Sequence, residues 1–163
     1  MQGIPLNERK RLGALLDDRP QTEVMAMIPQ FSQAETDNFV APPAQIPEAL
    51  GVLMFNMERG VNLPEIQEFL RDCPDIQPFD VILANELDDG CARSGNKNTA
   101  RELAQAFGLN YAWGLEFIEL VNDENAKGFH GNAVFSRWPI RRAGVIRLPE
   151  QYNWYFDRQK RIG

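Results

Sequence analysis

Histidine, cysteine and basic charge are all scarce in this chain of 163 residues. It has one histidine and two cysteines, and 23 Asp and Glu residues outnumber 17 Lys and Arg residues, giving a net charge of −6. Binding to long nucleic acid depends on neutralising many phosphates with Lys and Arg, so this charge disfavours bulk duplex DNA as a partner. Two cysteines do not make a disulfide framework in a chain of this length, which favours reduced thiols.

Long apolar runs are also missing. No stretch reaches the 18 or more apolar residues of a membrane span, and the first 20 residues lack the uninterrupted apolar core of a secretory signal. We therefore expect a cytoplasmic protein with no membrane span. Apolar residues make up 44% and charged residues 25% of the chain, which is ordinary globular usage and disfavours both disorder and a fibrous repeat.

Prolines divide the chain into two regions. Residues 7–17 place Leu12, Leu15 and Leu16 on one face and predict a short helix. Residues 19–48 contain five prolines among polar residues, which disfavours a continuous helix or a central strand. We therefore predict an N-terminal helix and a loosely attached Pro-rich linker over residues 1–49, followed by a regular domain over residues 50–163.

The second region alternates strand and helix patterns. Residues 50–55 and 80–84 are compact apolar runs typical of buried strands, and residues 63–72 between them place their apolar side chains on one helical face. The same periodicities predict a helix over 99–107 and strands over 110–120, 132–136 and 144–148. The order strand, helix, strand predicts an α/β domain with a parallel or mixed sheet.

A polar side chain follows each of the first two predicted strands. Asn56 ends the first strand and Glu86 the second, and if these strands are parallel neighbours both side chains emerge at the sheet edge where ligands bind. An amide and one carboxylate hold Mg²⁺ incompletely, because this ion keeps several waters and also takes substrate phosphate oxygens. From spacing alone, a turn cap at Asn56 and a solvated acid at Glu86 is the simpler interpretation.

Three sequence strings carry more weight when they are taken in order: GVLMFNMERG, DVILANELDDG and GFHGNAVFSRWPI. They resemble the first three sequence blocks of the endonuclease/exonuclease/phosphatase superfamily, which has the DNase-I-like fold, and the resemblance covers about residues 50 to 148. It implies an α/β (α+β) fold that is part of a four-layer α/β/β/α sandwich, here truncated. It also implies a hydrolase of phosphate esters, a phosphodiesterase, phosphomonoesterase or nuclease, that depends on Mg²⁺ or Mn²⁺.

The resemblance implies roles for four residues of this sequence. Asn56 matches a strand-end Asn in the family's phosphate and metal site, which makes it a candidate catalytic residue. Glu86 matches a strand-end metal ligand, and Glu58 occupies a position that is often acidic in the family, as a second candidate metal ligand. Asn132, in the third string, is expected to line the substrate cleft.

The residues around this pattern leave alternatives open. Arg93 and Asn96 follow Glu86 in a polar loop and are candidate substrate-binding residues, because they can reach a phosphate held by the metal. A solvated surface loop is an equally good interpretation. Imidazole groups titrate near neutral pH, but we expect His130 to be a loop histidine without a catalytic role, because the family's catalytic His lies in later blocks.

Those later blocks, a His-bearing strand end, a GDxN-type turn and a closing Asp-His pair, do not occur in this sequence. General acid–base catalysis is worth about 10²- to 10⁴-fold, so the chain alone is predicted to be inactive or nearly so. A half sandwich leaves an apolar sheet face uncovered, which predicts self-association or a complementary C-terminal half as partner. The alternatives are a non-catalytic interaction half-domain and a gene remnant.

Overall fold

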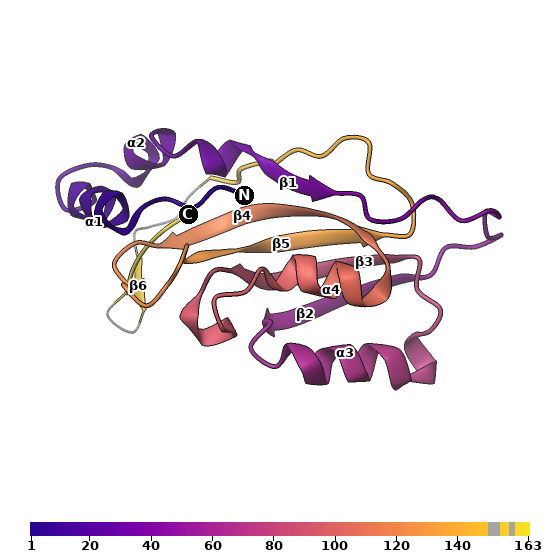
Figure 1. Ribbon diagram of the computed structural model, residues 1–163. Helices are drawn as coiled ribbons and strands as arrows, with labels where there is room; N and C mark the ends of the chain where they lie inside the picture. Colours follow the sequence, from indigo (N-terminus) through magenta and orange to yellow (C-terminus); the bar gives the residue numbers. More distant parts are fainter. Residues whose placement is uncertain (150–153, 157–158) are drawn as a thin grey trace.

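The computed structural model describes residues 1–149, 154–156 and 159–163 (Figure 1). Within these residues the chain forms four α-helices and one sheet of seven strands. The helices are α1 (Leu6–Leu15), α2 (Gln21–Ala26), α3 (Leu63–Asp72) and α4 (Thr99–Phe107). The strands are β1 (Ala34–Asp37), β2 (Val52–Arg59), β3 (Val81–Asp89), β4 (Asn110–Glu119), β5 (Phe129–Ser136), β6 (Trp154–Phe156) and β7 (Gln159–Ile162).

The sheet is mixed. Its strand order is β2-β3-β5-β4-β7-β6, and β1 pairs with β4 in addition. β2 and β3 are parallel and are joined through α3, whereas the other pairs are antiparallel. The mixed α/β class and the parallel pairing of the first two predicted strands are therefore confirmed. The sequence offered no assignment for β6 and β7.

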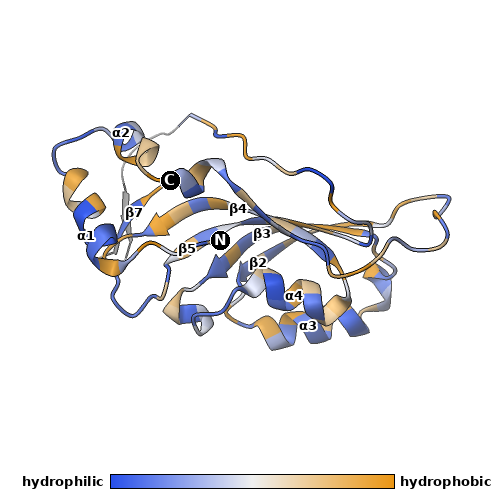
Figure 2. Ribbon diagram, turned by 45° about the horizontal axis from the view of Figure 1, so that its top comes forward, coloured by the Kyte–Doolittle hydropathy of each residue, from blue (hydrophilic) through white to orange (hydrophobic). Residues whose placement is uncertain are grey.

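Helices α3 and α4 lie together on one face of the sheet, which we call the inner face (Figure 1). Both helices carry hydrophobic residues beside hydrophilic ones, as expected for helices with one buried side (Figure 2). Leu70 of α3 and Leu103 of α4 are fully buried in the same core as Ile82 and Phe135, which are paired across β3 and β5. The opposite, outer face of the sheet carries no helix of comparable packing among the described residues.

The N-terminal region belongs to the same core and is not a loose arm. Val24, Ile28 and Phe31 are buried, and β1 pairs antiparallel with β4. The prolines shorten the elements rather than prevent them, because α2 has six residues and β1 has four. Arg9 of α1 fastens the region further by donating to backbone carbonyls, including that of Asn125 at 2.7 Å.

The segment over residues 140–149, which we call the strap, turns back after β5 and runs beside β1 (Figure 1). The strand predicted over 144–148 is wrong, because the strap has no regular structure. The edge of β4 that it approaches pairs with β1 at residues 111–114 and with β7 at residues 118–119, and between these pairings the strap contacts β4 through a side chain and not through a backbone ladder. Asn38 holds the start of the strap, donating to the carbonyl of Ile140 at 3.2 Å and accepting from its N–H at 2.8 Å.

The end of the strap is held by one arginine. Arg147 Nε donates to the carbonyl of Phe31 at 3.0 Å, and its guanidinium lies 4.4 Å from the centre of the Phe31 ring. Its Nη groups donate to the carbonyls of Leu115 and Glu116 in β4. Between the two anchors, Val145 packs over Gly114, so the strap crosses the outer face of the sheet. None of the described helices has the length and hydropathy needed to cross a membrane.

Candidate functional site

Three strands lose their regular register at the same level of the sheet. The shifts fall between Asn56 and Arg59 in β2, between Ala84 and Leu87 in β3, and between Leu115 and Phe117 in β4. A β-bulge turns side chains out of the normal alternation, and bulges are frequent beside functional sites. Each shifted segment contains one glutamate; these are Glu58, Glu86 and Glu116.

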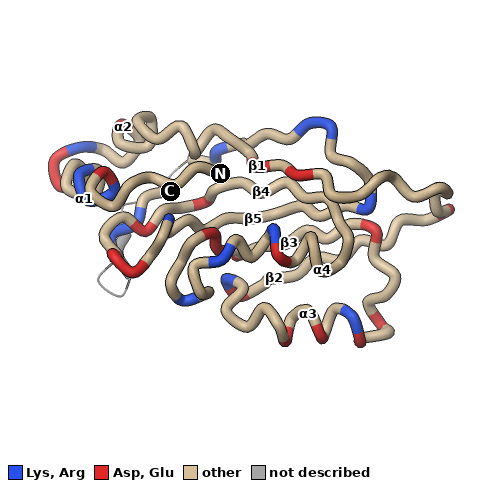
Figure 3. Tube along the Cα trace, viewed as in Figure 1, with Lys and Arg blue, Asp and Glu red and all other residues tan. Residues whose placement is uncertain are grey.

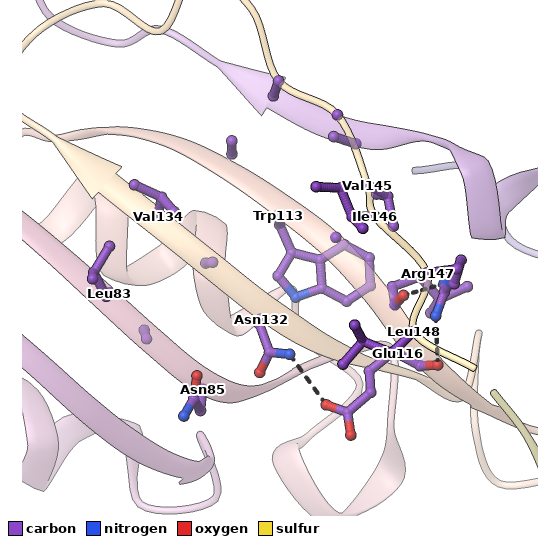
Figure 4. A pocket seen from close by; sticks show the side chains of 18 of the residues that line it. Leu83, Asn85, Trp113, Glu116, Asn132, Val134, Val145, Ile146, Arg147 and Leu148 are labelled. Carbon is purple, nitrogen blue, oxygen red and sulfur yellow. Dashed lines mark hydrogen bonds between the residues drawn. The ribbon is translucent and has the colours of Figure 1, made fainter. Parts of the chain in front are cut away.

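Four polar side chains form a chain of hydrogen bonds at this level. Asn56 Nδ2 donates to Glu86 Oε1 at 2.9 Å, and the Glu86 N–H donates to Asn132 Oδ1 at 3.2 Å. Asn132 Nδ2 in turn donates to Glu116 Oε2 at 3.2 Å, as Figure 4 shows. We call Asn56, Glu86, Asn132 and Glu116 the outer cluster. It joins four neighbouring strands, β2, β3, β5 and β4, on the outer face of the sheet.

The backbone at the glutamates of the first two bulges is unusual. Glu86 has φ = 58° and Glu58 has φ = 46°, in the left-handed region that residues other than glycine seldom adopt. On the inner side of the sheet, the indole N–H of Trp113 donates to the carbonyl of Leu87 at 3.2 Å and so holds the bulge in β3. Gly131 permits this contact, because a Cβ there would lie 2.8 Å from the Trp113 ring. The fold thus imposes the conformation that turns Glu86 outward.

The outer cluster lies at one end of a cavity of about 1180 Å³ between the sheet and the strap (Figure 4). Leu83 and Val134 contribute apolar side chains to its floor, and Val145 and Leu148 contribute to its wall. The cavity is therefore polar where the bulges lie and mostly apolar along the rest of its length, where Arg142 is a charged lining residue. A site of this kind, mostly apolar with a few convergent polar groups, is the usual form of a ligand site.

Three of the six residues that the sequence singles out come together here. Asn56, Glu86 and Asn132 all line the cavity and bond to one another directly or through the Glu86 backbone. Glu58 does not line the cavity; its N–H donates to Asn56 Oδ1 at 2.8 Å, which closes a turn at the end of β2.

The other two candidates lie away from the cavity. Arg93 donates to both oxygens of Asp88 at 2.7 and 2.8 Å and also to Glu119. Asn96 donates to and accepts from the backbone of residues 124–126. Both side chains are thus occupied by groups of the protein, and their role toward a phosphate stays a prediction.

A second, buried cluster lies one level further along the same strands. It comprises Asp88, Arg93, Glu119, His130 and Arg161; the two arginines form ion pairs with the carboxylates, and His130 is hydrogen-bonded to Asp88. The expectation of a loop histidine is wrong, because His130 is a buried residue of β5, with Nδ1 2.7 Å from Asp88 Oδ1 and its ring stacked on Phe117 at 4.4 Å. Burial alone would raise the pKa of Asp88, but hydrogen bonds to His130 and Arg93 hold it below its ordinary value.

Glu116 is the cavity residue that the sequence analysis misses. The alternation in 110–120 predicts Leu115 and Phe117 on one face, but these residues lie opposite Gly131 and His130, which are adjacent in β5 and face opposite ways. Glu116 is the extra residue between them and is exposed. Regular alternation already places it on the face opposite Trp113 and Leu115, and the adjacent apolar residues Phe117 and Ile118 are the sign in the sequence that the alternation changes phase here.

The outer cluster presents side-chain oxygens that are possible metal ligands. Among the described residues, no group of three or more His, Cys, Asp or Glu side chains is arranged to hold a metal ion. Two carboxylates and two amide oxygens suit a hard cation such as Mg²⁺, which keeps several waters, but they do not form a closed protein cage. The chain matches none of the protein-family models, curated proteins or solved structures with which it was compared.

Proposed function

We propose that this chain carries the metal- and phosphate-binding edge of a phosphate-ester hydrolase, of phosphodiesterase or nuclease type, that depends on Mg²⁺ or Mn²⁺. The observation that carries the proposal is the 2.9 Å hydrogen bond from Asn56 Nδ2 to Glu86 Oε1. It fixes a carboxylate at the carboxyl ends of two parallel strands, where ligands bind in open α/β sheets. The left-handed backbone of Glu86 supports the proposal, since strain of this kind gathers at functional sites.

Each residue has a distinct part in the proposed site. Glu86 is the metal ligand, and Asn56 orients its carboxylate through the hydrogen bond between them. Asn132 holds the Glu86 backbone and the Glu116 side chain on either side of the place where a phosphate would lie. A divalent metal bound there supplies charge stabilisation to the phosphoryl oxygens.

Turnover needs a general base in addition, and no histidine lines the cavity among the described residues. His130 is directed to Asp88 and Phe117 instead. Since general acid–base catalysis contributes about 10²- to 10⁴-fold, we expect the chain alone to bind metal and phosphate ester with little or no turnover. The exposed outer face supports the related proposal that this sheet is the first half of a four-layer DNase-I-like sandwich.

Metal binding tests the proposal without requiring turnover. Isothermal titration with Mg²⁺ and paramagnetic titration with Mn²⁺ should show weak binding to the unaltered chain and at least tenfold weaker binding to Glu86→Gln. Glu65→Gln is the matched control, because Glu65 is exposed on α3, on the inner side of the sheet. Equal binding by the Glu86→Gln variant and the unaltered chain would refute the proposed site.

A non-catalytic interaction half-domain is the second candidate, and the exposed apolar side chains of the outer face favour it. Under that function Glu86→Gln changes neither metal binding nor the binding of a partner. A gene remnant, the third alternative, predicts poor solubility and no cooperative unfolding transition.

A further inference from the structure

Two arginines of the strap, Arg142 and Arg147, line the cavity together with the carboxylates of the outer cluster. Figure 3 shows basic residues in blue along the strap, whereas Glu86 and Glu116 belong to the sheet. The cavity therefore has its acidic side chains on the sheet and its basic side chains on the strap. A ligand that lies between the sheet and the strap meets charges of both signs.

The guanidinium of Arg147 is fixed in place beside Glu116, as Figure 4 shows. Its Nε donates to the carbonyl of Phe31 at 3.0 Å, and its two Nη atoms donate to the carbonyls of Leu115 and Glu116. An arginine side chain has five N–H donors, so these three bonds leave two N–H groups without a partner among the described residues. The side chain is thus held by the protein and still has donors for a ligand.

The positive charge of Arg147 has no bonded carboxylate. Arg147 takes part in none of the ion pairs of the described part of the chain, and its hydrogen bonds go to neutral carbonyls. Burial lowers the pKa of Arg147 below its ordinary value, and the nearby charge of Glu116 offsets only part of this lowering. Guanidinium groups bind phosphate through charge-assisted hydrogen bonds, so such an arginine suits an anionic ligand.

Arg93 of the buried cluster shows the contrast. It donates to both oxygens of Asp88 and to Glu119, so its charge is neutralised within the protein. The sequence suggested Arg93 for a phosphate because it follows Glu86 closely in the chain. In the structure, Arg147 is the arginine that lines the cavity near the outer cluster, although it lies 61 residues after Glu86.

We propose that Arg147 binds the phosphate group of the ester from the strap, while a metal ion held by Glu86 binds it from the sheet. The assignment rests on the proposed function and adds one residue to its site. The carboxylate of Glu116 would repel a phosphate in the outer cluster, and the charge of Arg147 offsets this repulsion. Arg147 donates to the Glu116 carbonyl, so it lies on the far side of Asn132 from Glu86.

The spacing of the strands leaves room for this arrangement. β5 lies between β3, which carries Glu86, and β4, which carries Glu116, so two strand spacings of about 4.8 Å separate them. Two metal–oxygen bonds of about 2.1 Å and one hydrogen bond of about 2.8 Å cover about 7 Å of that width, and the phosphate group fills the rest. The metal and the phosphate therefore fit side by side.

Binding of phenyl phosphate in an excess of Mg²⁺, followed by the phosphorus NMR signal, tests the assignment. Arg147→Met should weaken this binding at least tenfold, because it removes both the charge and the hydrogen-bond donors. Arg142→Met is the matched control, since Arg142 is an exposed strap residue of the same charge that also lines the cavity. It should weaken binding by no more than about threefold, because exposed charges at a distance are screened.

Arg147 also anchors the strap, and a second substitution separates this role from phosphate binding. Arg147→Lys keeps the positive charge but, like Arg147→Met, loses the planar fork that bonds to the two carbonyls of β4. It should therefore bind phenyl phosphate several-fold more tightly than Arg147→Met. Equal binding by these two variants would show that only the position of the strap matters and would overturn the assignment. Circular dichroism establishes first that each variant is folded.

Glu86→Gln, measured with and without Mg²⁺, separates this assignment from the proposed function. Weaker binding by both Glu86→Gln and Arg147→Met supports both. If only Glu86→Gln binds more weakly, the metal site stands and the role of Arg147 is overturned. If only Arg147→Met binds more weakly, and Mg²⁺ has no effect, the role of Arg147 stands and the metal site is refuted. Equal losses in Arg147→Met and Arg142→Met, or no binding by the unaltered chain, overturn the assignment.

Discussion

The outer cluster and the buried cluster lie on adjacent levels of the same strands, yet they differ in how fully their acceptors are used. Asp88 is fully buried and accepts hydrogen bonds from Arg93 and Ser94 in addition to its contact with His130. The Glu86 carboxylate accepts one hydrogen bond, from Asn56, among the described residues and faces the cavity. A saturated, buried carboxylate contributes to the scaffold, whereas a carboxylate with spare acceptor capacity is available to a ligand.

The largest expected effect that separates the clusters is on stability. Asp88→Asn should lower the free energy of unfolding by about 3 to 5 kcal/mol, because it removes the charge of a fully buried carboxylate that is paired with the half-buried Arg93 and hydrogen-bonded to His130. Urea unfolding followed by circular dichroism measures this loss. Asp75→Asn, at an exposed position in a short 3-10 turn, is the control and should stay within about 0.5 kcal/mol of the unaltered chain. A loss below about 1 kcal/mol at Asp88 would show that the buried cluster does not support the fold.

The free energy of unfolding that Asp88 contributes should also depend on pH, and this effect should be smaller. The pKa of Asp88 is lower in the folded chain than its ordinary value of 3.8, so the folded state binds fewer protons there than the unfolded state. The stability from this carboxylate is therefore fully present above about pH 5 and is lost as the pH falls through 3.8 toward the folded pKa.

The measurement is the difference in unfolding free energy between the unaltered chain and Asp88→Asn at pH 7, 5, 4 and 3. This difference should be constant between pH 7 and 5 and should shrink toward pH 3, because protonation removes from the unaltered chain what the substitution removes from the variant. A difference that grows on acidification would contradict the lowered pKa of Asp88.

The contrast between the clusters follows from the sequence only in part. Apolar runs ending in Asn56 and Glu86 predicted two parallel strands with both side chains at one edge, and the structure brings these side chains within 2.9 Å. The burial predicted for the first run is wrong, because Val52 and Met54 face outward and are 57% and 75% exposed. The prediction of two parallel strands succeeded because strand period and strand order are local properties. The partners of Arg93 and His130 are not local, since Glu119 and Asp88 lie 26 and 42 residues away from them.

The bulge at Glu116 and the path of the strap were not predicted from the sequence either. A single extra residue at Glu116 reverses the facing of the rest of β4, and its mark in the sequence is no more than the adjacent apolar pair Phe117 and Ile118. Residues 144–148 have a strand-like sequence but form no ladder, and the side chain of Arg147 rather than the backbone bonds to the carbonyls of Leu115 and Glu116. Prolines marked the first region as irregular, yet Phe31 and Val24 are buried in the shared core. Burial and pairing of this kind depend on the whole fold.

The smallest expected effect concerns Glu86 itself and completes the contrast with Asp88. Glu86→Gln should stay within about 0.5 kcal/mol of the unaltered chain, because glutamine keeps the shape and an oxygen acceptor for Asn56. Glu86→Gly should be as stable or more stable, by up to about 1 kcal/mol. Its backbone at φ = 58° suits glycine, and this gain offsets the greater freedom of glycine in the unfolded chain.

Urea unfolding of both variants, with Mg²⁺ omitted, isolates the backbone effect from any ligand. If glycine stabilises the fold while removing the carboxylate, then glutamate at this position works against stability, and its presence needs a reason other than folding. If Glu86→Gly instead loses more than about 1 kcal/mol, the Glu86 side chain supports the fold as Asp88 does, and the distinction between an open cluster and a structural one fails.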